Sequence, residues 1–123
     1  MNISMEDFIK ICNNVNIIDI RNKQKYNFGH ILNAKNIDKS ELILNPNKYL
    51  NKKEKYYIYC QKGTSSLRLC QILSNIGYNV YSIKGGYEKW ILRKWLIIFF
   101  LFTIKLVYVI IKLRKELKLW VKK

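Results

Sequence analysis

Residues 95–111 form a continuous apolar stretch that divides the chain into two parts. These 17 positions carry one charge, Lys105, and contain neither glycine nor proline. Thirteen of them are Leu, Ile, Phe or Val. A small water-soluble domain has difficulty covering such a run with its own core, particularly the segment 99–102. The stretch therefore predicts a hydrophobic helix that is separate from the fold of the preceding residues.

Positive charge is concentrated in the tail. The 123 residues carry a formal net charge of +15. Residues 1–92 hold 14 Lys+Arg against 7 Asp+Glu, a net +7, whereas residues 93–123 hold 9 against 1, a net +8. Such a balance favours an anionic partner, either nucleic acid or a membrane surface. No aromatic-and-basic recognition motif accompanies the charge, so we expect no specific nucleic acid partner.

Residues 1–92 alternate between predicted strands and predicted helices. The strands are the β-branched and aromatic segments 15–20, 56–59 and 79–83. The helices cover residues 5–13, 40–44, 66–76 and a segment that begins at Tyr87. Ser4 is the expected cap of the first helix, Gly77 ends the third, and residues 21–30 are expected to form a polar loop. This alternation indicates an α/β fold with a mainly parallel sheet flanked by helices.

The cysteines and the single histidine limit the chemistry. Cys12, Cys60 and Cys70 are too few for a disulfide framework, and no signal peptide is visible at the N-terminus. We therefore expect residues 1–92 to lie in a reducing, cytoplasmic compartment. His30 is the only histidine and no paired-cysteine motif occurs, so no metal site and no cofactor are expected.

The segment after residues 56–59 has the features of a nucleophile site. Cys60 ends that predicted strand and precedes a short polar loop and a helix. Loop amides and a helix N-terminus favour negative charge, which lowers the pKa of a thiol and makes it nucleophilic. In the loop, Lys62 adds positive charge, Gly63 lets the backbone curl, and Ser66 is a candidate helix cap. The alternative is that Cys60 is an ordinary buried residue at a strand end.

Four segments within residues 3–92 resemble, in order and spacing, the motifs of single-domain rhodaneses, the sulfurtransferase family. They are Asp19-Ile20-Arg21; Gly29-His30-Ile31 with Asn33-Ala34 and Asn36-Ile37; residues 56–60 with Gly63 and Ser66; and Gly77-Tyr78 followed by Val80 and Gly85-Gly86-Tyr87-x-x-Trp90. Each motif alone is weak, whereas four in sequence are specific. The resemblance implies a rhodanese-like parallel sheet over residues 1–92, followed by a hydrophobic, basic helix over residues 93–123.

The resemblance also implies a reaction. The Cys60 thiolate would attack the sulfane sulfur of a small donor such as thiosulfate, and a Cys60 persulfide would form. The backbone amides of the loop would hold it, and the loop residues are Gln61, Lys62, Gly63, Thr64, Ser65 and Ser66. A thiophilic acceptor would then take the sulfur. The implied partners are the small donor, a thiol acceptor and a sulfur-acceptor protein, without a cofactor.

One loop position departs from the family pattern. The family often places arginine where this chain has Ser65, and loss of that cation weakens the binding of a dianionic donor. Lys62 is expected to compensate in part, whereas Arg68 is expected to point to solvent. The alternative function is therefore a catalytically weak or inactive rhodanese-like module that binds or regulates a partner at the membrane. Counted from Cys60 to Ser65, the loop has the six-residue length of the sulfurtransferases that the chain resembles. The related dual-specificity phosphatases carry one more residue and end in arginine, so phosphatase activity is not expected.

Supporting roles follow from the same motifs. Asp19 and Arg21 are expected to form a structural pair that ties the first strand to neighbouring loops, and His30 is expected to pack or hydrogen-bond structurally. Cys70 is expected to be a core residue rather than a second reactive thiol. The glycines at 85 and 86 are interpreted as determinants of the fold.

The energetics of residues 95–111 allow insertion into a bilayer. Thirteen apolar side chains contribute roughly −4 to −8 kcal/mol, against about +2.5 to +3.5 kcal/mol for Lys105. The helix would be about 25 Å long against a hydrocarbon core of about 30 Å. A membrane-spanning anchor is therefore the leading interpretation of the tail.

Orientation leaves alternatives open. Four Lys/Arg lie close before the stretch and six lie after it. This balance places the C-terminus inside and residues 1–92 outside, yet nothing in the sequence exports them. We expect a membrane-associated protein whose first 92 residues are cytoplasmic. A tail that lies in the membrane surface is one alternative, and an out-of-frame extension is another.

Overall fold

The computed structural model describes residues 1–122. The chain divides into two compact units, the first from Met1 to Trp90 and the second beginning at Ile91. Lys123, which belongs to the predicted basic tail, lies outside the described residues.

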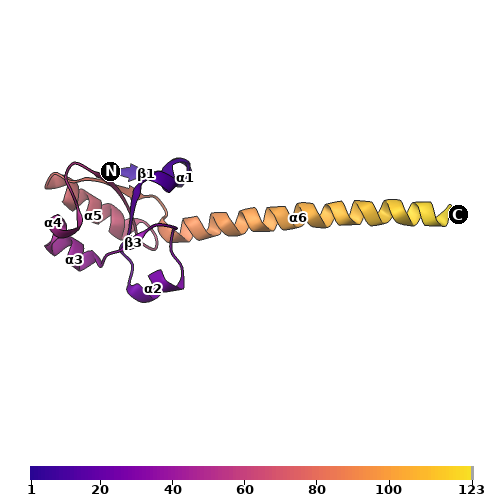
Figure 1. Cartoon of the computed structure of the whole chain (residues 1–123), viewed down its shortest axis with the longest axis horizontal. Coiled ribbons are helices and arrows are strands. Elements are labelled where there is room, and N and C mark those ends of the chain that lie inside the picture. Colours follow the sequence, from indigo (N-terminus) through magenta and orange to yellow (C-terminus); the bar gives the residue numbers. More distant parts are fainter. Residues whose placement is uncertain (123) are drawn as a thin grey trace. The chain divides into compact units, whose positions relative to one another are not determined.

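The first unit is built on a five-stranded sheet with the order β1-β5-β4-β2-β3 (Figure 1). All four strand pairings are parallel, as predicted. The strands are β1 (Asn2–Ile3), β2 (Asn16–Asp19), β3 (Lys35–Asn36), β4 (Lys55–Tyr59) and β5 (Asn79–Ile83). In the register of β2 and β4, Asp19 lies opposite Tyr59. The residues that follow these two strands therefore meet at the same edge of the sheet.

Six helices and one 3₁₀ turn complete the described chain. They are α1 (Met5–Ile11), the turn Cys12–Asn14, α2 (Lys23–Phe28), α3 (Lys39–Leu44), α4 (Pro46–Tyr49), α5 (Thr64–Asn75) and α6 (Gly86–Val121). The Ser4 hydroxyl accepts the Asp7 amide at 3.1 Å, which confirms the predicted cap of α1. At the end of α5, Gly77 has φ +97°, and the Tyr78 amide donates to the Leu73 carbonyl at 3.1 Å. This Schellman arrangement requires glycine after the cap and confirms the predicted stop.

Several boundaries differ from the sequence prediction. Residues 21–30, predicted as a loop, contain α2, because the Asn22 side chain accepts the Lys25 amide at 2.8 Å and starts a helix. Helix α3 ends at Leu44, as predicted, but Pro46 then begins a further helix, α4, that the sequence analysis did not predict; proline fits the first turn of a helix. The predicted cap Ser66 is wrong: Gly63 occupies the cap of α5, and Ser66 lies inside that helix.

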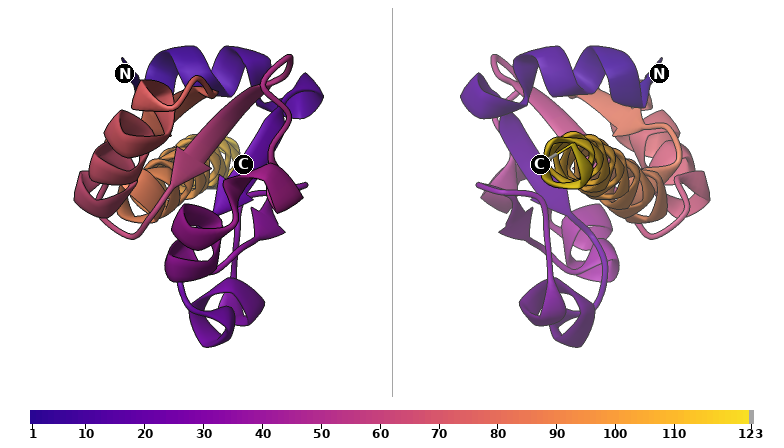
Figure 2. Two further views of the ribbon diagram at one scale, coloured as in Figure 1. Left: turned by 90° about the vertical axis from the view of Figure 1, so that its left-hand side faces the viewer. Right: turned by 90° about the vertical axis from the view of Figure 1, so that its right-hand side faces the viewer.

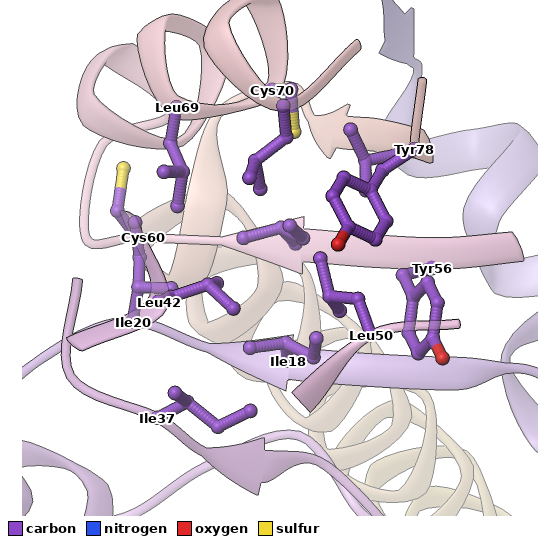
Figure 3. Packing of buried hydrophobic residues seen from close by; sticks show 13 residues of the cluster. Ile18, Ile20, Ile37, Leu42, Leu50, Tyr56, Cys60, Leu69, Cys70 and Tyr78 are labelled. Carbon is purple, nitrogen blue, oxygen red and sulfur yellow. The ribbon is translucent and has the colours of Figure 1, made fainter. Parts of the chain in front are cut away.

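Two hydrophobic clusters pack on the sheet, and alternation along β4 divides its side chains between them. Tyr57 and Tyr59 belong to one cluster with Met5 and Phe8 of α1. The other cluster contains buried residues of the sheet, α3 and α5, among them Ile18, Ile58, Leu42 and Leu73. Figure 3 shows Cys60 in this second cluster beside Leu69, and Cys70 farther along α5. Cys60 therefore emerges on the side of the sheet that α5 covers.

The second unit is the part of α6 that begins at Ile91. The apolar side chains of residues 95–111 are exposed throughout this helix; Phe99, for example, is 70% exposed. The helix is long and apolar enough to cross a membrane by length and composition. Nothing in the described chain covers these side chains.

Candidate active site

The Cys60 sulfur lies in a cradle of hydrogen-bond donors at the end of β4. The Gly63 amide donates to Sγ at 3.1 Å and the Ser66 amide donates to it at 3.4 Å. The Ser66 hydroxyl lies 3.4 Å from the same sulfur. Helix α5 begins at Thr64, so its positive N-terminal end adds to these donors. The arrangement stabilises negative charge on the sulfur.

Opposing effects set the pKa of this thiol. Burial of Cys60, which is 7% exposed, raises the pKa. Hydrogen bonds from the Ser66 hydroxyl and from the amides of Ser66, Gly63 and Lys62 lower it further than burial raises it. The pKa of Cys60 is therefore below the ordinary value, and the thiolate fraction at neutral pH is enlarged.

Two glycines give the loop its shape. Gly63 has φ +97°, a left-handed conformation that side chains disfavour, and a Cβ there would lie 2.9 Å from the Gly85 nitrogen. Gly86 packs directly against the carbonyl oxygen of Cys60, where a side chain has no room. The first backbone amides of α6 therefore reach the carbonyl groups of the loop: Tyr87 N donates to Cys60 O at 2.9 Å. The predicted role of Gly86 in the fold is thus specifically to support this loop.

Asp19 and Arg21 form a buried ion pair beside the loop. Arg21 Nη2 donates to Asp19 Oδ2 at 2.7 Å, and their side chains are 4% and 0% exposed. The Tyr59 hydroxyl donates to the same carboxylate oxygen at 2.6 Å. Burial and this carboxylate raise the pKa of Tyr59 well above its ordinary value, so it stays a donor.

Arg21 also ties the strand to three other segments, as predicted. Its Nη2 donates to the Gly29 carbonyl at 2.7 Å, and its Nη1 donates to Gln61 Oε1 at 3.3 Å. Its guanidinium carbon lies 3.8 Å from the centre of the Tyr87 ring. These contacts occupy the guanidinium, so Arg21 holds the loop in place and is not free to replace the arginine missing at position 65.

The remaining predicted residues lie apart from the sulfur. His30 is exposed, stacks on Tyr26 with ring centres 3.8 Å apart, and hydrogen-bonds the Tyr26 carbonyl, which is a structural role. Lys62, Thr64 and Arg68 are exposed, and Ser65 is half-buried. Cys70 is fully buried, and burial raises its pKa to about 12, so it is a core thiol, as predicted.

Sequence reasoning missed one polar residue of this region, Ser82. It lies at 0% exposure on β5, and its Oγ is 2.7 Å from Ser66 Oγ. The signal available in the sequence was a serine between Tyr81 and Ile83, in a strand whose other polar residue, Asn79, is exposed. Because serine is compatible with a strand, the sequence pattern gave no reason to assign Ser82 a role at the site.

A pocket of about 390 Å³ opens beside the loop, and its walls are Arg21, Gln24, Lys25, Phe28, Gln61 and Tyr87. Phe28 at the end of α2 is 97% exposed, and Figure 2 shows α2 set apart from the sheet, at the bottom of both views. A larger cavity of about 540 Å³ lies near the start of β2, beside Asn16 and Tyr56. The larger cavity has no wall from residues 60–66, whereas Gln61 of that loop lines the smaller pocket, so the smaller pocket is the one beside Cys60.

Metal chemistry has no support in the described residues. Within residues 1–122, no group of three or more His, Cys, Asp and Glu side chains gathers that would hold a metal ion. Cys12, Cys60 and Cys70 are all free thiols.

Comparison with known proteins gives the same family for the first unit. The family model described as rhodanese-like domain matches residues 4–93. The uncharacterized protein YqhL of Bacillus subtilis is 39% identical over 75 residues, which are 60% of this chain and 59% of that protein. Thiosulfate sulfurtransferase GlpE of Coxiella burnetii is 35% identical over 75 residues, which are 60% of this chain and 69% of that protein.

Solved structures share the fold. A rhodanese-related protein from Thermoplasma volcanium superposes with a TM-score of 0.69 at 30% identity, over 75% of this chain and 91% of that one. The human single-domain sulfurtransferase TSTD1 superposes with a TM-score of 0.63 at 20% identity, over 73% and 94% of the two chains. The second likeness shows the fold alone.

Proposed function

The chain belongs to the rhodanese-like domain family, and from this premise we propose that it is a sulfurtransferase that carries sulfane sulfur on Cys60. The observation that carries the proposal is the set of donors around Sγ, led by the Gly63 amide at 3.1 Å. A persulfide is an anion at neutral pH, and such donors stabilise it without any change in the protein. No cofactor is needed.

In the first half-reaction the Cys60 thiolate attacks the sulfane sulfur of a donor such as thiosulfate. A new S–S bond forms, the S–S bond of thiosulfate breaks, and sulfite leaves with the electron pair. The terminal sulfur of the Cys60 persulfide now carries the negative charge. The amides of Gly63 and Ser66, which already donate to the Cys60 sulfur, lie next to this position and supply hydrogen bonds to it.

In the second half-reaction an acceptor thiolate, or cyanide, attacks the terminal sulfur. The persulfide bond breaks and the Cys60 thiolate leaves with the electron pair, which restores the starting state. We place the acceptor in the pocket between α2 and the loop, because two of its walls, Gln61 and Tyr87, adjoin Cys60 directly. Exposed Phe28 gives a sulfur-acceptor protein an apolar contact there.

Ser65 supports a second candidate function. Arg21 is committed to Asp19 and Gln61, and Arg68 is exposed on α5, so neither guanidinium lies ready to hold thiosulfate as a bidentate partner. Lys62 supplies a single point charge at best. On this reading the first unit is a weak or inactive rhodanese-like module that binds or regulates a partner.

For the second unit we propose a membrane anchor formed by residues 95–111. Apolar side chains occupy consecutive positions 96–102 and so face every direction around α6. A helix lying in the membrane surface needs one polar face, which this segment lacks. Arg93 and Lys94, on the first unit's side of the span, suit the anionic headgroups of a cytoplasmic leaflet. We further propose that the first unit lies on the cytoplasmic side, where thiols stay reduced.

Steady-state kinetics of the full chain in detergent test the proposed reaction. With thiosulfate as donor and cyanide as acceptor, we expect thiocyanate formation with ping-pong kinetics. Cys60→Ser should abolish it, whereas the matched variant Cys70→Ser should retain it because Cys70 is a core thiol. A Cys60→Ser variant as active as the natural chain, or a natural chain without activity toward any sulfane donor, contradicts the proposal, and the latter favours the binding module.

Carbonate extraction of the membrane fraction tests the anchor. A spanning helix keeps the protein in the pellet. Release of the protein into the supernatant would exclude a span and favour a tail that lies on the membrane surface.

A further inference from the structure

The Ser66 hydroxyl has more neighbours than it has hydrogens. Its Oγ lies 3.4 Å from the Cys60 sulfur, 3.2 Å from the Gly63 carbonyl oxygen and 2.7 Å from Ser82 Oγ. A serine hydroxyl donates one hydrogen and accepts through two lone pairs. Which neighbour receives the Ser66 hydrogen therefore depends on what the other neighbours donate.

Ser82 has a simpler position. It lies near the end of β5 at 0% exposure, and its backbone amide donates to the Met1 carbonyl oxygen. Among residues 1–122, Ser66 Oγ is the only hydrogen-bond partner of the Ser82 hydroxyl. A buried hydroxyl without a partner is costly, so Ser82 is held to Ser66 in either direction of donation.

The charge on Cys60 decides that direction. When Cys60 is a thiol, its hydrogen points to Ser66 Oγ, and the Ser66 hydrogen goes to the Gly63 carbonyl or to Ser82. When Cys60 is a thiolate, the sulfur needs a hydrogen and the Ser66 hydroxyl turns toward it. Ser66 Oγ then has lone pairs free, and Ser82 is the neighbouring hydroxyl that donates to it.

We propose that Ser82 is a positioning residue for Cys60: its hydroxyl donates to Ser66 Oγ and thereby directs the Ser66 hydrogen to the Cys60 sulfur. The chain of donation runs from β5 through α5 to the end of β4. Hydrogen bonds in such a buried chain polarise one another, so the bond to the sulfur strengthens. The catalytic consequence of this inference rests on the proposed function. The effect of Ser82 on the ionisation of Cys60 can be measured without any sulfur transfer.

The two half-reactions respond differently to this chain of donors. Thiolate is consumed in the first half-reaction and leaves in the second. A weaker hydrogen bond from Ser66 raises the pKa of the Cys60 thiolate that leaves in the second half-reaction, which slows its departure at every pH. The attack on the sulfane-sulfur compound in the first half-reaction slows only at those pH values where the thiolate fraction of Cys60 falls, because a more basic thiolate is also a better nucleophile. Loss of Ser82 should therefore slow the second half-reaction more uniformly than the first.

The test is the pH dependence of Cys60 alkylation by iodoacetamide in the full chain, read on the Cys60 peptide by mass spectrometry. Ser82→Ala should move the midpoint upward by about 0.5 to 1 pH unit, the size expected for one hydrogen bond to a charged acceptor chain. Ser74→Ala is the matched control, because Ser74 is on the same helix as Ser66 and its buried Oγ has no hydrogen-bond partner among the residues that the structure describes. The control midpoint should equal that of the natural chain.

A double-mutant cycle separates action through Ser66 from a general loosening of the site. In a Ser66→Ala background, Ser82→Ala should cause no further shift of the midpoint. An unchanged midpoint in Ser82→Ala, or an equal shift in both backgrounds, overturns the inference. Alkylation requires no sulfur transfer, so a chain that never accepts sulfur but shows the shift would refute the proposed function and keep Ser82 as a positioning residue.

Discussion

The two units use the same kinds of apolar side chain in opposite ways. In the first unit, residues such as Leu73 and Ile58 are fully buried in clusters on the two faces of one sheet. In the second unit, residues such as Leu101 and Phe99 are 60% and 70% exposed. Each unit is thus distinct by itself: the first buries its apolar side chains in two clusters on its own sheet, and the second leaves them exposed.

The two units also differ in how their positive charge is placed. About half of the net +15 belongs to the tail, where it flanks an apolar stretch, and the rest is spread over residues 1–92, which contain Cys60. The reactivity of Cys60 and the membrane attachment of the tail are expected to be independent of one another. The predictions below separate them, from the largest effect to the smallest.

Removing either property should leave the other intact. A chain that stops after Leu92 should lose all membrane retention yet form thiocyanate from thiosulfate at the natural rate. Cys60→Ser should do the reverse, losing turnover while remaining in the carbonate-resistant pellet. Fractionation and a thiocyanate assay on the same preparations measure both. Turnover that vanishes with the tail would show that the two units are not independent.

A matched pair of leucine substitutions tests the difference in burial. Leu73→Ala removes a fully buried side chain of α5 and should lower the free energy of unfolding of the first unit by about 2 to 5 kcal/mol. Leu101→Ala removes a side chain that is 60% exposed and should leave that free energy unchanged. Denaturant unfolding in detergent, followed by tyrosine and tryptophan fluorescence, measures both. Equal losses would mean that the tail contributes to the fold of the first unit.

Donor binding should depend on charge within the loop and not on charge in the tail. Ser65→Arg restores a fork of donors and should lower the KM for thiosulfate by about tenfold or more, as one charge-assisted bond of about 1.5 to 3 kcal/mol implies. Lys112→Ala, which changes the tail charge by the same amount, should leave KM unchanged. A KM that responds to Lys112 instead would indicate long-range attraction of the donor by the tail.

Cys60 and Cys70 should titrate at different pH. The pKa of Cys60 is lowered, so its alkylation rate should rise with pH and reach half its maximum below the ordinary thiol value. Burial raises the pKa of Cys70 to about 12, so its alkylation should remain slow across the whole neutral range. Peptide mass spectrometry of a pH series measures both, and truncation after Leu92 should shift neither. Similar profiles for Cys60 and Cys70 would contradict the view that the hydrogen bonds to Cys60 lower its pKa.

The sequence predicted those parts of the fold that have local causes. Ser4 caps α1 and Gly77 terminates α5 because a side-chain oxygen and a left-handed backbone act within a few residues. Strands β2, β4 and β5 carry their own β-branched and aromatic pattern. The two-residue strands β1 and β3 have no such pattern, since pairing with β5 and β2 alone makes them strands.

The candidate site was predicted as a segment but not as a network. Cys60 and its loop follow from the order strand, polar loop, helix. The contacts of Arg21 with Gln61 and Gly29, and the bond between Ser66 and Ser82, join residues that only the fold brings together. Even the cap of α5 depends on such a contact, because Gly63 passes against Gly85.

The most direct test of the central claim is the intact mass of the full chain after incubation with thiosulfate and removal of the donor. The account predicts a gain equal to one sulfur atom, located on the Cys60 peptide, removed by cyanide or a reducing thiol, and absent from Cys60→Ser. A chain whose mass never changes, with Cys60 reduced and accessible to alkylation, would contradict sulfur transfer through this cysteine.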